Sequence, residues 1–248
     1  QRDFYDLAVG NVPFGNYKVN DKAYNNLGFS IHNYFFAKAL DQVRPGGIVA
    51  FVTSRFTMDS KDSSARKYLA QRADLLGAVR LPNNAFKANA GTEVVSDILF
   101  LQKLERPIDR EPEWVQVGQT PEGFTVNQYF VDHPDMVLGE FSAESTQYGR
   151  EDVTVDPIEG ADLAEQLKSA MAHINGRYEA VERVNTELDE GAPDVLPADP
   201  GVKNFSYTVV DGEIYYRENS VMASVNLNGD AKERVKGMVE LRGLVNEL

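Results

Sequence analysis

Apolar runs of strand length alternate with helical patterns along the first 103 residues of the chain. Four apolar runs have the length and composition of strands: residues 4–9, 48–53, 75–81 and 94–103. Residues 30–43 carry apolar side chains at three- and four-residue steps, residues 60–73 are charged on one side, and both stretches predict helices. The order strand, helix, strand, helix, strand, strand predicts an α/β fold with helices packed over a largely parallel sheet.

The residues around the first predicted helix mark its two ends. Ser30 is the predicted N-cap, and the stripe expected to be buried consists of Ile31, Phe35, Ala39, Leu40 and Val43. Pro45, Gly46 and Gly47 are expected to stop the helix, with a glycine in the left-handed cap. Residues 82–92 leave no room for a helix between the last two strands, which predicts that this pair is antiparallel.

The pattern changes after a boundary rich in prolines and charges at residues 105–113. Five features are expected beyond it: an irregular segment at 114–160 with a possible strand at 114–117, a long helix at 161–188, an acidic linker at 189–202, a hairpin at 205–217 around Asp211-Gly212, and a terminal helix at 229–248. The sequence therefore predicts two parts. Residues 1–107 form part of an α/β sheet, and residues 108–248 form an accessory α+β region of helices and a hairpin.

The two predicted parts differ in charge. Residues 1–107 contain 14 Lys and Arg against 10 Asp and Glu, a net of +4, whereas residues 108–248 contain 11 against 28, a net of −17. The overall charge of −13 therefore hides a mildly basic first part. Such asymmetry suggests that residues 1–107 face a nucleic acid and that residues 108–248 have a different function, because an acidic surface repels phosphate.

Composition argues against several kinds of site and location. The chain has no cysteine, hence no disulfide and no thiolate metal site, which suits a reducing cytoplasm. His32, His133 and His173 stand singly, so no metal site is expected. No apolar run approaches the roughly 20 residues of a membrane helix, and the charged opening residues predict no signal peptide. We expect a cytoplasmic protein without a membrane or metal partner.

The candidate chemistry lies directly after the first predicted strand. This run ends in Gly10, and Asn11, Val12, Pro13 and Phe14 follow it. Open α/β sheets bind their ligands outside the carboxyl ends of the strands. An amide, a rigid backbone and an aromatic ring at that place are suited to hold a flat base. The alternative is a simple strand-to-helix turn with a buried ring.

Residues 6–15, Asp-Leu-Ala-Val-Gly-Asn-Val-Pro-Phe-Gly, resemble the catalytic motif of N6-adenine DNA methyltransferases, which in that family reads Asn/Asp-Pro-Pro-Tyr/Phe. The resemblance continues through residues 44–53, 76–82, Phe86 and 91–103. It implies a partial Rossmann-like methyltransferase sheet that contains the later strands of the catalytic domain. The Asn-Val-Pro-Phe variant is similar to that of large methylase–helicase fusion proteins of bacterial mobile elements, and so implies a connection with restriction-modification.

The resemblance implies a role for each residue of the motif. The Asn11 side-chain oxygen and the Val12 backbone carbonyl would accept the two N6 hydrogens of adenine, which favours the attacking form of a poor nucleophile. Pro13 would fix the backbone, and Phe14 would stack on a base that has left the duplex. Val12 departs from the usual proline, a change that keeps the carbonyl but makes the loop less rigid.

Further contacts with DNA are expected from loops on the same side of the sheet. Phe86 is placed where family members carry a second residue that touches the flipped base, and the alternative is a core phenylalanine that anchors its loop. Five basic residues are expected to meet phosphates, or else to be plain solvated surface: Lys18, Lys22, Arg55, Lys61 and Lys87.

The resemblance implies S-adenosylmethionine as the methyl donor of the full-length protein. In the family a glycine-rich loop after the first strand of the sheet holds this cofactor. The sequence contains no such loop, so we expect the cofactor-binding residues upstream of Gln1, and we expect the chain alone to bind the cofactor weakly or not at all. The expected function is methyl transfer to adenine N6 in DNA within a larger polypeptide. The alternative is an inactive methylase-like module that positions DNA for a fused helicase.

Overall fold

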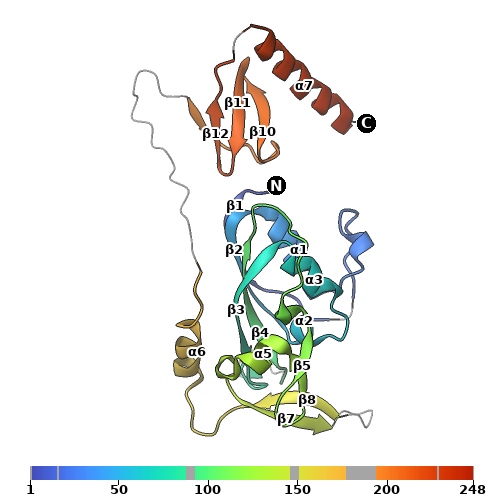
Figure 1. Cartoon of the computed structure of the whole chain (residues 1–248), viewed down its shortest axis with the longest axis vertical. Helices are drawn as coiled ribbons and strands as arrows, with labels where there is room; N and C mark the ends of the chain where they lie inside the picture. The colour runs from blue at the N-terminus through green and yellow to red at the C-terminus, as the bar shows by residue number, and fades with distance from the viewer. Residues whose placement is uncertain are drawn as a thin grey trace.

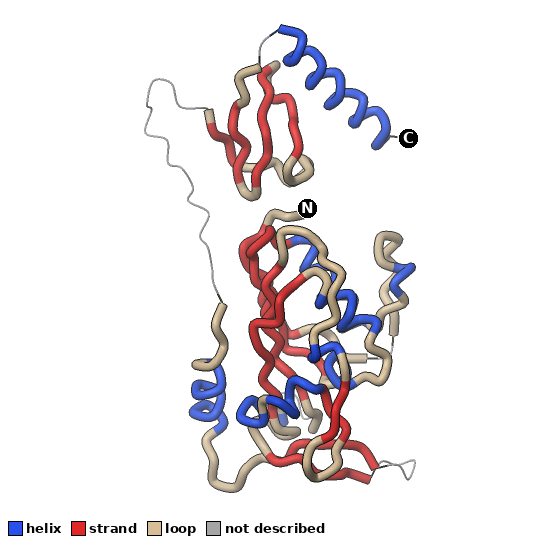
Figure 2. Tube along the Cα trace, in the orientation of Figure 1, coloured by secondary structure: helices blue, strands red, loops and turns tan. Residues whose placement is uncertain are grey.

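The computed structural model describes residues 2–15, 17–87, 93–145, 151–176, 194–227 and 229–247. Within these residues the chain has a mixed α/β fold with two four-stranded sheets and two short hairpins (Figure 1). The larger sheet is formed by residues up to Lys103, and the smaller sheet with its C-terminal helix follows residue 193 (Figure 2). Among the described helices, none is both long enough and apolar enough to cross a membrane.

The first half of the chain contains these elements: β1 (Tyr5–Asn11), η1 (Asn25–Leu27), α1 (Ile31–Gln42), β2 (Val43–Ser54), α2 (Phe56–Asp59), α3 (Ser64–Ala70), β3 (Ala73–Leu81) and β4 (Ser96–Lys103). The second half contains these: η2 (Glu113–Val115), β5 (Val117–Gln119), β6 (Thr125–Asn127), α5 (Gln128–Asp132), η3 (Pro134–Met136), β7 (Glu140–Ser145), β8 (Glu151–Asp156), α6 (Leu163–Met171), β9 (Val195–Pro197), β10 (Ser206–Val210), β11 (Glu213–Glu218), β12 (Val221–Ser224) and α7 (Gly229–Glu247).

The topology of the larger sheet brings three strand ends to one edge. The strand order is β1-β2-β4-β3, in which β1 runs parallel to β2 and β4 is antiparallel to both β2 and β3. The carboxyl ends of β1, β2 and β3 therefore lie at the same edge of the sheet. The predicted antiparallel pairing of the last two strands is confirmed, and β4 is found between β2 and β3.

The four predicted strands and the first predicted helix are confirmed with shifts at their ends. Of the predicted stripe on α1, Ile31, Ala39, Leu40 and Val43 are buried and Phe35 is half-buried. Of the predicted helix at 60–73, only residues 64–70 are helical, as α3, and a separate helix, α2, ends at Asp59 before the predicted start, with a break between the two. A buried arginine explains the break, because Arg66 Nη2 donates to the Ser60 carbonyl at 2.7 Å and so occupies an acceptor that a continuous helix would use.

Residues 45–47 belong to β2 rather than to a helix cap. Helix α1 ends at Gln42, and the chain enters β2 directly. The register between β1 and β2 shifts at this point, which defines a bulge. A Cβ on Gly47 would lie 2.8 Å from the Arg44 carbonyl oxygen, so the close backbone approach requires glycine. The predicted left-handed glycine cap on α1 is therefore wrong.

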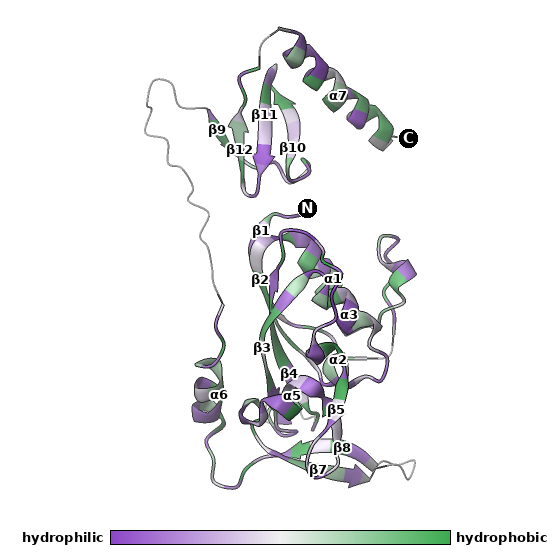
Figure 3. Cartoon of the chain, viewed as in Figure 1, coloured by the Kyte–Doolittle hydropathy of each residue, from purple (hydrophilic) through white to green (hydrophobic). Residues whose placement is uncertain are grey.

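One hydrophobic core joins the sheet to its helices. The central strands β2 and β4 contribute Val49, Leu99 and Leu101, and α1 covers one face with Phe36 and Leu40. Figure 3 shows the corresponding hydrophobic colour along the strands of the sheet. Each buried side chain of this size contributes about 1.5–3 kcal/mol. Helix α6 lies on the side of the sheet opposite α1 (Figure 1).

The segment predicted to be irregular forms two hairpins and a helix that pack on the same core. Strand β5 pairs with β6, β7 pairs with β8, and α5 lies between the two hairpins in the chain. Trp114 lies in η2 rather than in a strand and is 8% exposed against the core, so the strand expected at 114–117 is wrong. These strands are three to six residues long and depend on docking, which leaves little periodicity in the sequence.

A buried ion network fixes α2 to the sheet. Arg80 of β3 donates to both carboxylate oxygens of Asp97 on β4 and to Asp59 of α2, each at 2.8 Å. All three side chains are at most 3% exposed. Burial alone would lower the pKa of Arg80, but the two carboxylates raise it above its usual range, so the guanidinium stays charged. Each charge of the network thus depends on its partners, because an unpaired buried charge is strongly unfavourable.

The same network holds the second half of the chain through backbone groups. Asp59 accepts the Asn127 backbone N–H at 2.9 Å, and the Arg80 carbonyl accepts the Leu138 N–H at 2.9 Å. The Arg80 guanidinium also lies 4.2 Å from the centre of the Phe130 ring on α5. The apolar core and this network therefore both continue past the predicted boundary at residue 107.

The helix predicted for residues 161–188 is shorter among the described residues. Helix α6 is capped by Asp162, whose carboxylate accepts the Ala164 N–H at 2.8 Å, and it ends at Met171. Ile174 follows without helical structure and packs against the sheet, where a Cβ on Gly77 would lie 2.9 Å from it. The remainder of that prediction falls on residues 177–188, which lie outside the described residues.

The predicted hairpin and terminal helix are confirmed within the smaller sheet. Strands β10 and β11 meet at Asp211 and Gly212, both with positive φ, and the strand order is β10-β11-β12-β9. Strand β9 lies in the stretch predicted as a linker, because its residues are ordered by pairing with β12. Helix α7 contacts β10, where Arg242 donates to the Tyr207 carbonyl at 2.8 Å.

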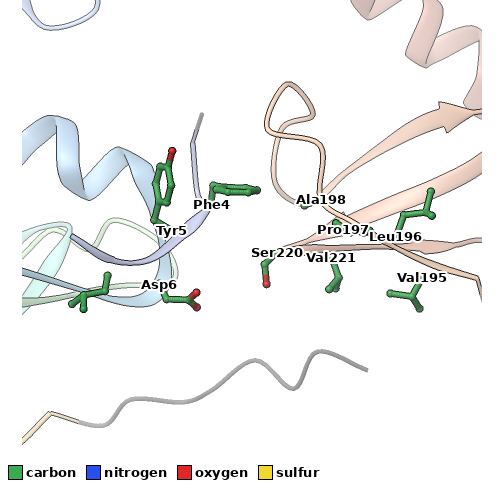
Figure 4. Close-up of a pocket in the computed structure, with 10 residues that line it drawn as sticks. Phe4, Tyr5, Asp6, Val195, Leu196, Pro197, Ala198, Ser220 and Val221 are labelled. Carbon is green, nitrogen blue, oxygen red and sulfur yellow. The ribbon is translucent and has the colours of Figure 1, made fainter. Parts of the chain in front are cut away.

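The smaller sheet contacts the start of the chain through Arg217 of β11. This fully buried side chain donates to the carbonyls of Arg2 and Asp3 at 3.0 Å. Beside this contact, residues 4–7 and 195–198 face each other across a cavity of about 600 Å³ (Figure 4). The lining of this cavity includes none of the residues for which the sequence predicts a role.

Replacing Arg80 with methionine is expected to lower the free energy of unfolding by about 3–5 kcal/mol, because Asp97 and Asp59 would remain buried without their cation. Urea unfolding at neutral pH measures this loss. Arg106→Met, at an exposed position, is the matched control and should change stability by less than about 0.5 kcal/mol. Equal unfolding midpoints for the two variants would contradict the structural role of Arg80.

Candidate functional site

A cavity of about 330 Å³ lies at the edge where β1, β2 and β3 end. Its walls come from loops that are distant in the sequence and from the β7–β8 hairpin. Six of the lining residues define these walls: Phe14 after β1, His32 at the start of α1, Arg55 and Phe56 after β2, Glu93 before β4, and Asp152 on β8. This is the position at which open α/β sheets place their ligands.

The loop after β1 has a fixed backbone and exposed functional groups. Asn11 ends β1, and the Val12 N–H donates to the Val52 carbonyl of β2 at 3.0 Å while its side chain is 5% exposed in the core. Asn11 and Pro13 are exposed, and Phe14 is 37% exposed and lines the cavity. The Phe14 ring is therefore not the buried ring of a simple turn. Asn11 is not among the residues that line the cavity.

His32 also lines this cavity, although the sequence assigned no role to it. The side chain is 6% exposed, and its Nε2 lies 3.0 Å from the Ser30 hydroxyl. This contact explains why Ser30, although at the N-cap, makes no side-chain hydrogen bond to the helix amides. Burial lowers the pKa of His32 below its ordinary value, which favours the neutral imidazole at neutral pH. In the sequence, only its place two residues after a capping serine could have pointed to it.

Arg55 is held within the protein. Its side chain is 11% exposed, its Nη2 donates to Asp152 of β8 at 2.5 Å, and its Nη1 lies 3.7 Å from Asp59. The guanidinium also lies 4.2 Å from the centre of the Phe56 ring. The geometry therefore places Arg55 between the sheet and the β7–β8 hairpin, whereas its contact with a DNA phosphate stays a prediction.

The other predicted contact residues are dispersed around the edge. Lys87 forms an ion pair with Glu93 at the rim of the cavity. Lys18 is exposed and lines a separate hollow with Tyr24 and Tyr34, and Lys22 and Lys61 are exposed as well. Phe86 is half-buried and packs against the core, as its alternative interpretation expects. Of the predicted contact residues, Phe14 and Arg55 line the cavity, as does Glu93, the ion-pair partner of Lys87. Lys18 and Phe86 do not line it.

Acidic residues of the second half contribute to the wall of the cavity. Glu144 and Asp152 come from the β7–β8 hairpin, and Glu93 comes from the loop before β4. The hairpin is attached through Asn83, whose N–H donates to the Val155 carbonyl at 2.8 Å and whose amide donates to Thr154 at 3.2 Å. The sequence did not predict this wall, because the hairpin lies in the stretch expected to be irregular.

The described ranges contain no group of three His, Asp or Glu side chains placed to hold a metal ion. The carboxylates nearest the cavity are engaged instead with basic side chains, as Asp152 is with Arg55 and Glu93 is with Lys87.

Replacing Arg55 with glutamine is expected to lower the free energy of unfolding by about 1–2 kcal/mol, because its charged hydrogen bond to Asp152 of the hairpin is lost. Urea unfolding measures this effect, and Lys18→Gln is the exposed control, expected to stay within about 0.5 kcal/mol of the parent chain. A fully stable Arg55→Gln variant whose DNA affinity falls and becomes less dependent on salt would instead favour the phosphate contact.

Comparison with known proteins gives partial matches. No family model matches the chain. The defense against restriction protein B of Escherichia phage P1 is 37% identical over 108 residues, which cover 41% of this chain and 5% of that protein. The chain therefore spans about one twentieth of the length of this curated relative.

Solved structures resemble the chain at low identity. A class I S-adenosylmethionine-dependent methyltransferase of Listeria monocytogenes is 22% identical, with 44% of this chain and 34% of that chain covered and a TM-score of 0.34. A modification subunit of a type I restriction enzyme of Vibrio vulnificus YJ016 is 19% identical, with 62% and 37% covered and a TM-score of 0.34. The EcoKI M protein of a type I restriction enzyme is 12% identical, with 69% and 48% covered and a TM-score of 0.34. The chain thus spans between a third and a half of these structures.

Proposed function

We propose that this chain carries the target-base part of the active site of a DNA methyltransferase that acts on adenine N6. One observation carries the proposal: Asn11-Val12-Pro13-Phe14 follows an edge strand whose backbone is bonded to β2, and in this segment Asn11 is exposed while the partly exposed Phe14 lines a cavity. A turn with a purely structural role has no need to keep an amide and an aromatic ring in solvent. The resemblance of residues 6–15 to the family's motif supports the same assignment.

Two acceptors at this loop would activate the amino group of adenine. The N6 lone pair is delocalised into the ring, so N6 is a poor nucleophile until its hydrogens are held by acceptors that favour a pyramidal nitrogen. The Asn11 side-chain oxygen and the Val12 carbonyl are the proposed acceptors. The Val12 N–H is bonded to the Val52 carbonyl at 3.0 Å, which holds the Asn11–Val12 peptide unit directly before the proposed Val12 carbonyl acceptor, without a proline at position 12.

Phe14 is the proposed stacking surface for the base. A base inside a duplex cannot reach the edge of this sheet, so it must leave the stack and enter the pocket. Stacking on an aromatic side chain contributes about 1–3 kcal/mol per base. The exposed Phe14 ring at the mouth of the 330 Å³ cavity is available for that contact. DNA is thus the proposed partner.

S-adenosylmethionine is the proposed methyl donor of the whole protein. The described residues show no glycine-rich turn of the kind that usually holds this cofactor, because the first helical element after β1 is η1, at residues 25–27, and β2 leads directly into α2. The contribution of this chain is therefore confined to the target base, and the donor is assigned to other residues of a longer polypeptide.

A DNA methyltransferase of this kind could protect the DNA of a mobile element against restriction. The name of the phage P1 relative describes protection against restriction, and methylation of adenine is one chemistry by which DNA escapes a restriction enzyme. A fused helicase remains a proposed partner within the larger polypeptide. The alternative function is an inactive module that positions DNA for the helicase. The methylation rate of an Asn11→Ala variant distinguishes the two functions.

An Asn11→Ala change in the longer protein that contains this chain is expected to lower the rate of adenine methylation by about 100-fold or more, because one of the two N6 acceptors is lost. Transfer of labelled methyl groups from S-adenosylmethionine to DNA measures the rate. Asn26→Ala, at an exposed position, is the control and should keep full activity. Undiminished methylation by the Asn11→Ala protein would exclude the catalytic proposal and favour the inactive module.

Calorimetric titration of the 248-residue chain with S-adenosylmethionine is expected to give no binding in the micromolar range, because its strand-to-helix connections lack a glycine-rich turn. A micromolar dissociation constant would contradict this expectation and would place the donor on the chain itself. Unfolding with and without the cofactor offers a second measurement, since a ligand that binds the folded state raises stability.

A further inference from the structure

One buried polar atom at the cavity has no partner. Among the described residues, three buried side-chain polar atoms lack a hydrogen bond: His32 Nδ1, Asn33 Oδ1 and Ser96 Oγ. Of these three residues only His32 lines the cavity that Phe14 also lines. An unsatisfied buried polar group costs about 1–3 kcal/mol, so a native chain keeps one where strain or function requires it.

The contact with Ser30 determines what His32 offers to a ligand. The Ser30 hydroxyl lies 3.0 Å from Nε2 and can either donate to this nitrogen or accept from it. When the hydroxyl donates to Nε2 of a neutral imidazole, Nδ1 carries the proton and becomes a donor. Because Ser30 makes no hydrogen bond to the helix amides, its hydroxyl is free to take this orientation.

The surroundings of the cavity select the class of ligand. Glu93, Glu144 and Asp152 contribute carboxylates, and Arg55 is already bonded to Asp152, so an anion such as phosphate is disfavoured there. Phe14 and Phe56 contribute aromatic surface. A neutral heteroaromatic ring with a nitrogen acceptor satisfies both the aromatic walls and a donor on Nδ1.

We propose that His32 is a base-recognition residue, whose Nδ1–H donates to a ring nitrogen of the adenine that enters the cavity beside Phe14. This inference rests on the proposed function and adds a second recognition contact to it. Asn11 and Val12 hold the exocyclic amino group, whereas His32 contacts the ring. A donor at that position accepts a ring nitrogen of adenine, and where this nitrogen is N1 it rejects guanine, which presents an N–H at the same place.

The contact requires a local movement of His32. Nδ1 is shielded from solvent in this structure, and only 6% of the residue is exposed. The proposed contact uses a rotation of the imidazole about its Cβ–Cγ bond, which exchanges the places of Nδ1 and Cδ2 and, at the same time, those of Nε2 and Cε1, so the Ser30 hydroxyl must move with Nε2 to keep its contact. The Ser30 hydroxyl can follow this movement because it is not fixed by a helix cap.

Nitrogen NMR of the 248-residue chain tests the contact directly. The chain has three histidines, so ¹⁵N-histidine labelling gives three imidazoles, and a His32→Gln variant assigns the one in question. Addition of a single-stranded oligonucleotide with one adenine is expected to move the His32 Nδ1 signal and to fix the Nδ1–H tautomer. An otherwise identical oligonucleotide of thymines is expected to leave it in place. A His32 signal that does not move, or that moves equally with both, overturns the proposal.

Single-atom changes in the base identify the nitrogen that is contacted. Oligonucleotides with 1-deaza-, 3-deaza- or 7-deazaadenine each replace one ring nitrogen with CH, and fluorescence anisotropy gives their affinities. One of the three is expected to bind about tenfold more weakly to the parent chain, the size of one lost hydrogen bond. His32→Phe keeps a buried ring without the donor and should lose this discrimination, whereas His32→Asn, which keeps an N–H near Nδ1, should restore part of it.

The control and the contradicting results separate this inference from the proposed function. His173→Gln, at an exposed position, should discriminate like the parent chain. Discrimination that persists in a folded His32→Phe chain overturns the role of His32. If the Asn11→Ala protein loses methylation while His32 shows no effect, the proposed function stands and this inference fails. If the adenine contact is present and Asn11→Ala keeps full activity, the catalytic proposal fails instead.

Discussion

The bidentate pair between Arg80 and Asp97, extended to Asp59, is the interaction on which the rest of the structure depends. It joins β3 and β4 to α2, and from there the Asp59 carboxylate and the Arg80 backbone carbonyl accept the N–H groups of residues 127 and 138 of the second half. Because all three charges are buried, none can be removed alone without leaving another unpaired. The network therefore specifies one arrangement of these elements, which apolar packing alone would fix less strictly.

This arrangement explains how an acidic region comes to lie beside the carboxyl edge of the sheet. In the first half, Phe14 follows β1 and Arg55 follows β2. The β7–β8 hairpin of the second half packs against these residues, held by the ion pair of Asp152 with Arg55 and by the hydrogen bond from Asn83 to the hairpin. The cavity therefore belongs to neither predicted part alone. Three carboxylates line it against one cation, Arg55, and this balance favours a neutral aromatic ligand over an anionic one.

The conformation of residues 11–14 follows from strand geometry as well as from residue type. Asn11 can remain exposed because it ends an edge strand, and Val12 can be fixed because its N–H continues the parallel ladder to Val52. Pro13 cannot extend this ladder, since it has no N–H, so the chain leaves the sheet at that residue. Phe14 is then carried away from the core and over the cavity rather than into the protein.

The sequence by itself determined the elements whose periodicity is strong and whose burial is local: the four strands of the larger sheet, α1, the hairpin at Asp211-Gly212, and the motif at residues 11–14. It also predicted the antiparallel last pair, because a short connection between two strands favours that pairing. Only the tertiary structure decided the rest. The bulge at Gly47, the break that Arg66 makes between α2 and α3, and the short hairpins of residues 117–156 depend on partners far away in the chain. His32 belongs to this second group, since no single-sequence pattern distinguishes a core histidine from one that lines a cavity with a nitrogen left unpaired.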